Sequence, residues 1–433
     1  MTTLSKAIRS ILVASLCSTA VVSQAALLED VYQQALSNDP QLKIAEATFR
    51  SNKEILNQAK SVLLPSVAAT AGTSYADSSY NSFNNHGYTI SLVQPIFSAE
   101  KWFTYQQGKF VDQQAQLRFD QAQQNLILRS VETYLNVLRA QSNLSTAEAQ
   151  ERAIKRRLDQ VNAQFDVGLI AITDVHEAQA SYDNARVSLI EAEGALDNSY
   201  EALERLTGQA YSQVDVLKAD YPIDNIEPAT PDAWLKKGLE GNLALRLAAL
   251  DINVAEQNAK IARAGHYPTV ELNATHDYDK GTVSTNVLVR SNVVGIKLSV
   301  PLYQGGAISS KSRQAYAQMD ASMQSHEDAL RGLKQSTRSL LRDLKTNVLS
   351  VNARKQSIVS SQAALDATSE GFNVGTRNVV DVLTAEQALY AAQRDYANAR
   401  LDYVLNLFKF KQTVGTLAPD DLLGLDEWLA PKS

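Results

Sequence analysis

The chain has 433 residues, of which 45% are hydrophobic and 20% charged, and its formal net charge is −6. This acidic balance argues against nucleic-acid binding, which needs a basic surface. Long helices are favoured, because no proline lies between Pro95 and Pro222 or between Pro301 and Pro419.

The first 25 residues are predicted to be a signal peptide, 1–25, rather than part of the fold. Two basic residues precede an apolar run at 11–22, and small residues at 23 and 25 predict cleavage before Ala26. Cys17, the only cysteine, lies in this leader, and Leu16 stands where a lipoprotein leader carries a small residue. No later stretch has the roughly 18 consecutive apolar residues of a transmembrane helix. An exported soluble protein or a β-barrel remains.

Four segments alternate apolar and polar residues with period two, at about 66–76, 87–96, 269–279 and 287–301. This is the pattern of strands with one apolar face, and it suits either two soluble β-hairpins or an outer-membrane barrel. Tyr75, Tyr88 and Tyr278 near the far strand ends suit an aromatic girdle. A barrel needs about eight strands at least, so several chains would have to share one.

Long helices are predicted after each strand pair, and the chain is a tandem repeat. Hydrophobic residues follow three-four steps, typical of coiled coils, and one arm runs from Ser98 to Phe165 over roughly 100 Å. The motif FDVGLIAITDV at 165–175 returns as FNVGTRNVVDV at 372–382, 207 residues later. We expect one repeat at 26–208 and another at 241–415, joined by 209–240 and followed by 416–433.

Each copy of the motif is predicted to be the tip of a helical hairpin. Gly168 and Gly375 follow the last apolar residue of the incoming helix, where a left-handed backbone is common. Asp174, with Thr173 beside it, and Asp381 stand where we expect the N-caps of the outgoing helices.

No catalytic or metal-binding pattern is found. The five histidines, at 86, 176, 266, 276 and 326, show no metal-ligand spacing, and neither a Ser, His and acid grouping nor a phosphate-binding glycine loop is present. We therefore predict a protein that is not an enzyme and needs no cofactor.

Several segments together carry a resemblance to a known family. They are TYLNVLRA at 133–140, LDQVNAQFDVGLIAITDV at 158–175, VVGIKLSVPLYQGG at 293–306, FNVGTRNVVDVL at 372–383 and DYANARLDYVLN at 395–406. In this order they resemble the TolC family of trimeric outer-membrane channels, from about Leu27 to Trp428. The resemblance implies a mainly α fold with membrane β-strands. Long coiled-coil hairpins would form a twelve-helix α-barrel tunnel, and four strands per protomer would enter a twelve-stranded barrel. Segments 209–240 and 416–433 would form a small mixed α/β equatorial region.

The resemblance also implies function and partners. It predicts a passive homotrimeric exit duct in outer-membrane lipid, with a tunnel reaching into the periplasm, for drug efflux or type I protein secretion. An inner-membrane efflux pump or ABC transporter and a periplasmic adaptor would recruit the duct and open its periplasmic end. The adaptor would dock on the tips at Gly168, Leu169, Gly375 and Thr376. Two other hypotheses are that the chain is itself such a coiled-coil adaptor, or a structural rod.

Site residues at the tips are likewise implied by the resemblance. Asp381 would form a ring of three carboxylates in the gate and attract cations. Many relatives have a second acid where this chain has Thr384, so the two acidic rings are reduced to one. Arg377 would form a latch between hairpins, with Thr173 and Asp174 as acceptors. The plainer alternatives are that Asp381 only caps a helix and that Arg377 is a solvated loop cation.

The latch is expected to be weaker than in relatives that carry a tyrosine at its centre. Here Phe372 replaces that tyrosine and has no hydroxyl to donate. We therefore expect one hydrogen bond fewer and a lower barrier to opening.

Overall fold

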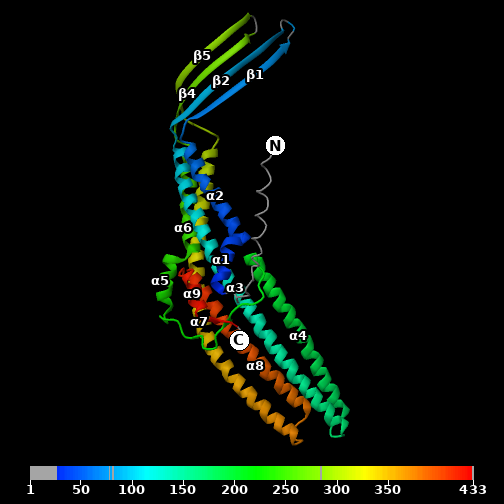
Figure 1. Ribbon diagram of the computed structural model, residues 1–433. Coiled ribbons are helices and arrows are strands. Elements are labelled where there is room, and N and C mark those ends of the chain that lie inside the picture. Colours follow the sequence, from blue (N-terminus) through cyan, green and yellow to red (C-terminus); the bar gives the residue numbers. More distant parts are fainter. Residues whose placement is uncertain (1–26, 78, 80–81, 283–284, 432–433) are drawn as a thin grey trace, which may run out of the picture.

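The computed structural model describes residues 27–77, 79, 82–282 and 285–431. The predicted signal peptide lies outside the described residues. The molecule is elongated, with a sheet at one end, two helical hairpins at the other and a thicker helical region between them (Figure 1). The two repeats run side by side along this length.

Four long strands form one antiparallel sheet: β1 (Ser66–Asp77), β2 (Ser82–Phe97), β4 (Thr269–Thr282) and β5 (Thr285–Ser299). Their order is β1-β2-β4-β5, so the two repeats meet where β2 pairs with β4. The prediction that β2 starts at 87 was five residues too late. β2 also runs through Pro95, and the register shifts between Pro95 and Phe97, because proline has no N–H to donate to its neighbour.

The helices of the first repeat are α1 (Leu28–Asn38), α2 (Pro40–Ser61), α3 (Ala99–Asp166) and α4 (Ile172–Thr207). Those of the second part are α5 (Pro231–Gly241), α6 (Leu243–Ala264), α7 (Ala307–Asn373), α8 (Val379–Thr413) and α9 (Asp420–Asp426). With 68 and 67 residues, α3 and α7 are each about 100 Å long. Within the described part of the chain, every helix is too short or too polar to cross a membrane.

The long helices set the order of neighbours across the molecule. Away from the sheet α3 packs on α4, α7 packs on α8, and α3 also packs on α8, which gives the order α4-α3-α8-α7. Nearer the sheet α2 lies against α3, and α6 lies between α3 and α7. Four helices therefore stand side by side at both levels. In Figure 1 the two lower hairpins end at separate tips.

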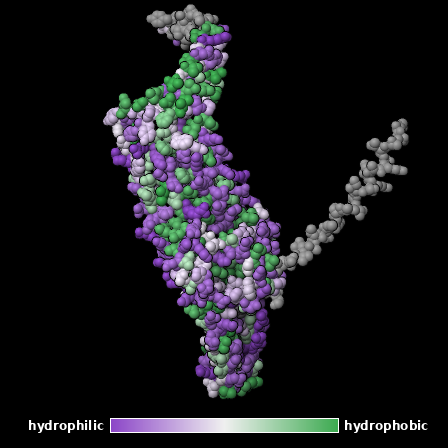
Figure 2. All heavy atoms as spheres, turned by 90° about the vertical axis from the view of Figure 1, so that its left-hand side faces the viewer, coloured by the Kyte–Doolittle hydropathy of each residue, from purple (hydrophilic) through white to green (hydrophobic). Residues whose placement is uncertain are grey.

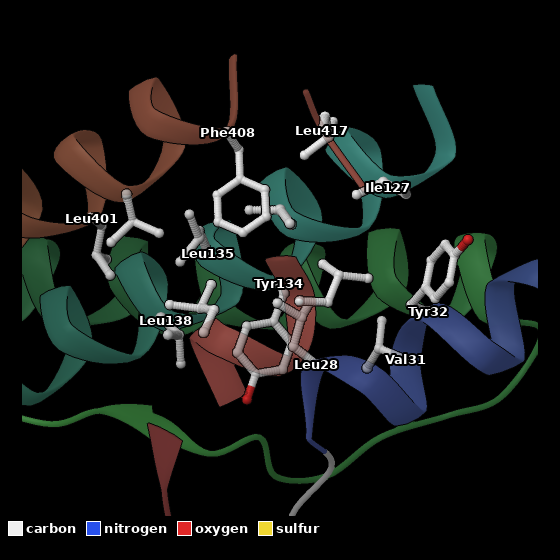
Figure 3. Close-up of a cluster of buried hydrophobic side chains, with 14 of the residues drawn as sticks. Leu28, Val31, Tyr32, Ile127, Tyr134, Leu135, Leu138, Leu401, Phe408 and Leu417 are labelled. Atoms are coloured by element: carbon white, nitrogen blue, oxygen red, sulfur yellow. The ribbon is translucent and has the colours of Figure 1, made fainter. Parts of the chain in front are cut away.

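The main hydrophobic core lies midway along the helices, where the ends of the chain meet its central linker (Figure 3). Tyr134 on α3 is fully buried there and donates a hydrogen bond from its hydroxyl to the Asp215 carbonyl at 2.8 Å. Two short strands, β3 (Val216–Leu217) and β6 (Leu429–Ala430), pair beside it. This is the small α/β region that the resemblance implied, built from the linker and the C-terminal segment.

The start of α1 is tied to the other end of the chain. The backbone N–H groups of Leu28 and Glu29 donate to the two carboxylate oxygens of Asp426 at 2.9 and 2.8 Å. These donors belong to the first turn of the helix, which has no partners within α1. Leu28 and Val31 are completely buried, and burying such a side chain contributes about 1.5–3 kcal/mol.

Candidate functional site

Both hairpin tips have the same turn at the end of the incoming helix. At the first tip Gly168 has φ +74, and its N–H donates to the Phe165 carbonyl at 2.8 Å while Leu169 N donates to Gln164 O at 2.9 Å. This pair of bonds is the Schellman motif, which ends a helix with one left-handed residue. Glycine takes that conformation without the steric cost of a Cβ.

The second tip repeats the motif and adds a bond. Gly375 has φ +79, its N–H donates to Phe372 O at 3.0 Å, and Thr376 N donates to Gly371 O at 2.8 Å. The Thr376 hydroxyl also donates to Gly371 O, at 3.0 Å. The left-handed conformation predicted for Gly168 and Gly375 is therefore confirmed.

The outgoing helices begin earlier than predicted, so the expected N-caps were wrong. Helix α8 has Asn378 as its N-cap: the Asn378 side-chain oxygen accepts from Asp381 N at 2.8 Å, and the Asp381 carboxylate faces Asn378 N at 3.5 Å. This reciprocal capping box places Asp381 three residues into the helix. In α4 the N-cap is Ala171, so Thr173 and Asp174 lie inside the first turn.

The structure brings Arg377 and Asp381 together. Their closest atoms, Nη1 and Oδ2, are 3.8 Å apart, and the two side chains are 61% and 39% exposed. The Arg377 side chain also crosses Gly371, where an added Cβ would lie 2.8 Å from Arg377 Cγ. Gly371 therefore gives Arg377 its path along the turn, a role that the sequence did not reveal.

The predicted latch partners stand apart from Arg377 within one chain. Among the described residues, no hydrogen bond or ion pair joins Arg377 to Thr173 or Asp174. Thr173 is exposed and Asp174 is half-buried at the start of α4. Thr384, which replaces the second acid that the family resemblance led us to expect, is exposed one turn beyond Asp381.

The two tips pack against each other through a small hydrophobic cluster. Its buried members come from α3, α4 and α8: Ile154, Leu158, Val161, Ala178, Ala185, Val379 and Leu383. Phe372 packs on it from the end of α7. Although the tips are distant from the main core, each hairpin therefore has a buried contact with the other.

A buried ion pair lies beside this cluster, and the sequence gave no sign of it. Arg157 Nη2 of α3 and Glu386 Oε1 of α8 are 3.1 Å apart, and their side chains are only 12% and 7% exposed. Arg157 also approaches the Ser369 hydroxyl of α7 at 3.5 Å, and its guanidinium stands 5.9 Å from the Phe372 ring centre. Arg157 of α3 thus contacts both α7 and α8 close to the hairpin tips.

The far ends of the tips are apolar and exposed. Val167 and Leu169 at the first tip are 70% and 72% exposed, and Val374 at the second is 72% exposed. Isolated exposed apolar residues are ordinary in proteins, and these three lie at the ends of the two hairpins.

Comparisons with known proteins agree with this architecture. The chain matches the outer membrane efflux protein family twice, over residues 31–209 and 234–416. It is 36% identical over 435 residues to outer membrane protein TolC of Escherichia coli (96% of this chain, 87% of that protein). It is 34% identical over 409 residues to TolC of Vibrio cholerae, covering 93% of each.

A solved structure shows the same fold. The outer membrane protein VceC of Vibrio cholerae superposes with a TM-score of 0.77 at 17% identity, covering 90% of this chain and 96% of VceC. The two family matches end 207 residues apart, the spacing that separates the two tip motifs. The resemblance seen in the sequence is confirmed: the chain belongs to the outer membrane efflux protein family.

Proposed function

We propose that three copies of this chain form one continuous exit duct, with a β-barrel in the outer membrane and an α-helical tunnel in the periplasm. The observation that carries the proposal is the helix order α4-α3-α8-α7, which leaves α4 and α7 at the two outer edges of each protomer. Both edge helices carry exposed apolar residues: Val187 and Ile190 on α4, and Leu349 and Val359 on α7. Such faces suit packing of α4 on α7 of the next copy.

The sheet supports the same assembly. Among the strands that the structure describes, β1 and β5 are the two edges of the sheet, and each pairs with a neighbour on one side only. Within lipid, unpaired backbone groups cost several kcal/mol each, so a membrane sheet must close on itself. Four strands are too few to close alone, and three copies give the twelve strands that the family resemblance implies.

The duct is a passive outer-membrane channel rather than an enzyme, as its family is. The TolC proteins are named as outer membrane proteins, and a 28% identical relative, AprF of Pseudomonas aeruginosa, is named as an alkaline protease secretion protein. Drug efflux and type I protein secretion are the exports that suit this chain. An inner-membrane pump supplies the energy, and a periplasmic adaptor joins it to the duct.

The tips are the adaptor's docking site in this proposal. Gly168 and Gly375 give the two turns the same shape, and an added Cβ at either position would meet no atom within 4 Å. The bare turns and the exposed Leu169 and Thr376 beside them leave room for the hairpin of a partner. Export should therefore be sensitive to side chains added at these turns.

The gate lies at the same end. Three Asp381 carboxylates around the tunnel axis attract cations to a narrow entrance. Arg377 bonds Thr173 and Asp174 of a neighbouring hairpin in the closed trimer. Its partial exposure and its long contact to Asp381 leave the guanidinium free to do so. Opening separates the hairpins and breaks these contacts.

The assembly is tested by the mass of the detergent-extracted mature chain in native mass spectrometry. The proposal predicts a complex of three chains that needs detergent to leave the outer membrane. A water-soluble monomer would contradict it. A variant with Val187→Glu and Ile190→Glu on α4 should lose the trimer. Leu423→Glu on α9, which is exposed but lies outside the row of long helices, provides the control.

A further inference from the structure

The two faces of the sheet differ in chemistry. Residues on one face of a strand alternate with those on the other, and paired residues in neighbouring strands share a face. One face, called the apolar face here, carries Val67, Ile90, Leu92, Leu272, Val294, Ile296 and Leu298. The other, the polar face, carries Thr89, Ser91, Asn273, Thr275, Asp277 and Ser291. Figure 2 shows hydrophobic residues gathered on the sheet near its junction with the helices.

Basic residues replace apolar ones at the far end of the apolar face. Tyr88, Tyr278 and Arg290 are paired across three strands, and Lys280 follows in the next row, opposite His86. The Arg290 guanidinium lies 5.6 Å from the centre of the Tyr278 ring, which stacks on Tyr88 at 5.1 Å. Arg290 thus lies against an aromatic pair, and Lys280 lies one row further along on the same face of the sheet; these four residues are together called the platform.

Most acidic residues of the sheet lie on the face opposite this platform. Asp277 faces the polar side, where it accepts hydrogen bonds from the Thr89 hydroxyl at 2.7 Å and the Ser291 hydroxyl at 3.2 Å. Asp279 lies two residues further along on the same side. Among the described strand residues, the one acid on the apolar face is Asp77, at the far end of edge strand β1 and two rows beyond Lys280. The platform therefore has a local excess of positive charge.

The position of the platform matches the outer surface of the membrane. Eight residues separate Val270, near the helices, from Tyr278, which is about 27 Å along the strand and roughly 20 Å across a membrane at a tilt of about 40°. This approaches the height of the apolar band of an outer-membrane barrel, which ends in aromatic girdles. Because the helices extend into the periplasm, the platform lies at the outer leaflet.

We propose that Arg290 and Lys280 bind the phosphate group of a glycolipid in the outer leaflet, with Tyr88 and Tyr278 beneath it. An arginine fork suits a phosphate bidentately, and lysine adds a second positive charge. Three such sites would surround one trimer. The inference rests on the proposed barrel, which places the apolar face against lipid.

Binding of lipid A to the purified trimer in detergent tests the proposal, with diphosphorylated and chemically dephosphorylated lipid A as the two probes. Native mass spectrometry counts the bound lipids. Wild type should bind the diphosphorylated form about tenfold more tightly or better. The double variant Arg290→Gln and Lys280→Gln should lose this preference. Lys297→Gln, in the same sheet but on the polar face opposite Glu271, should keep it.

Equal binding of both lipid forms by wild type, or an undiminished preference in the double variant, would overturn the proposal. Displacement of lipid A by millimolar inorganic phosphate would overturn the glycolipid as the source of the phosphate. Conductance in phosphatidylcholine bilayers, which lack the glycolipid, separates the two proposals. A wild type without pores contradicts the barrel, whereas a conducting protein that shows no phosphate preference contradicts only the lipid site.

Discussion

Arg157 donates a hydrogen bond to Glu386 across the contact between the two hairpins, with 3.1 Å between Nη2 and Oε1. The two residues are 229 positions apart in the chain. Arg157 Nη1 also donates to Gln160 at 2.8 Å, which holds the guanidinium in place on α3. Since separation of the hairpins must break this pair, we interpret it as part of the closed state.

Removing one member of the pair should destabilise the closed tips. Glu386→Ala leaves a buried arginine without its partner, and breaking a buried pair in this way costs about 3–5 kcal/mol. We expect faster hydrogen exchange in the tip halves of α3 and α8 and a larger fraction of open channels in planar bilayers.

The control for this prediction is Arg354→Ala. Arg354 pairs with Asp395 at 2.7 Å, but both side chains are about 40% exposed, so the loss should stay below about 1 kcal/mol. A double variant, Arg157→Leu with Glu386→Leu, should recover most of the lost protection because no charge stays buried. Equal exchange in Glu386→Ala and wild type would rule out a role for the pair in closure.

Asp381 should control ion selectivity more than stability. Asp381→Asn removes a charge from the proposed gate but keeps a side-chain oxygen for the capping box, so the stability cost should be about 0.3–1 kcal/mol. Reversal potentials under a salt gradient should show reduced preference for cations. Asp166→Asn, an exposed acid at the end of α3, should leave selectivity unchanged. Unchanged selectivity in Asp381→Asn would leave Asp381 as a helix-capping residue only.

Arg377 should influence opening with little effect on the fold. The Arg377–Asp381 pair is exposed and 3.8 Å long, so Arg377→Ser should alter unfolding stability by less than about 1 kcal/mol. If Arg377 latches neighbouring hairpins, single-channel records should show more frequent opening. Gly371→Ala should act in the same direction, because its Cβ would displace the Arg377 side chain. Wild-type gating in both variants would mean that Arg377 is a solvated cation.

Two substitutions at Gly375 distinguish an effect of backbone strain in the turn from an effect on adaptor docking. Gly375→Val forces a branched residue into the left-handed region, whereas Gly375→Asn tolerates that conformation better. If the adaptor needs a bare turn, both variants should assemble as trimers and lose export. Export by Gly375→Asn at the wild-type level would show that only the turn conformation matters.

Asp426 should make stability depend on pH. Burial raises its pKa above the ordinary 3.8, although the N–H donors of Leu28 and Glu29 oppose this shift. The folded chain then keeps a proton that the unfolded chain has lost, so its stability falls as pH rises from about 4 through the raised value. The apparent unfolding midpoint of wild type should fall relative to that of Asp426→Asn over this range.

The matched control for this pH effect is Asp420→Asn, an exposed acid in α9. The unfolding midpoint of Asp420→Asn should change with pH in the same way as that of wild type. A constant difference between wild type and Asp426→Asn at every pH would contradict the assigned titration.

The sequence predicted the features that local patterns determine. Apolar residues spaced three and four apart predicted the long helices. Gly168 and Gly375 predicted the turns, because glycine is the residue that most readily takes the left-handed conformation after the end of a helix. The N-cap of α8 was placed three residues too late. Asn378 followed by Asp381 three residues on is itself a capping-box pattern, and it was the better signal.

Contacts between segments that are distant in the sequence could not be predicted from local sequence patterns. Arg157 and Glu386 lie on helix faces whose other positions are mostly apolar. The sequence near either residue does not indicate that the two form a pair. The path of Arg377 over Gly371 also depends on the turn already being folded. Likewise, the pairing of β2 with β4 joins the two repeats and fixes which cations share a face of the sheet.

The central claim is that three chains pool their strands and helices into one pipe, and conductance of the purified protein in a planar lipid bilayer tests it most directly. The account predicts discrete, long-lived, cation-preferring current steps from the three-chain species. The claim would be contradicted if correctly folded trimer produced no ionic current across the bilayer, or if a single chain produced such currents.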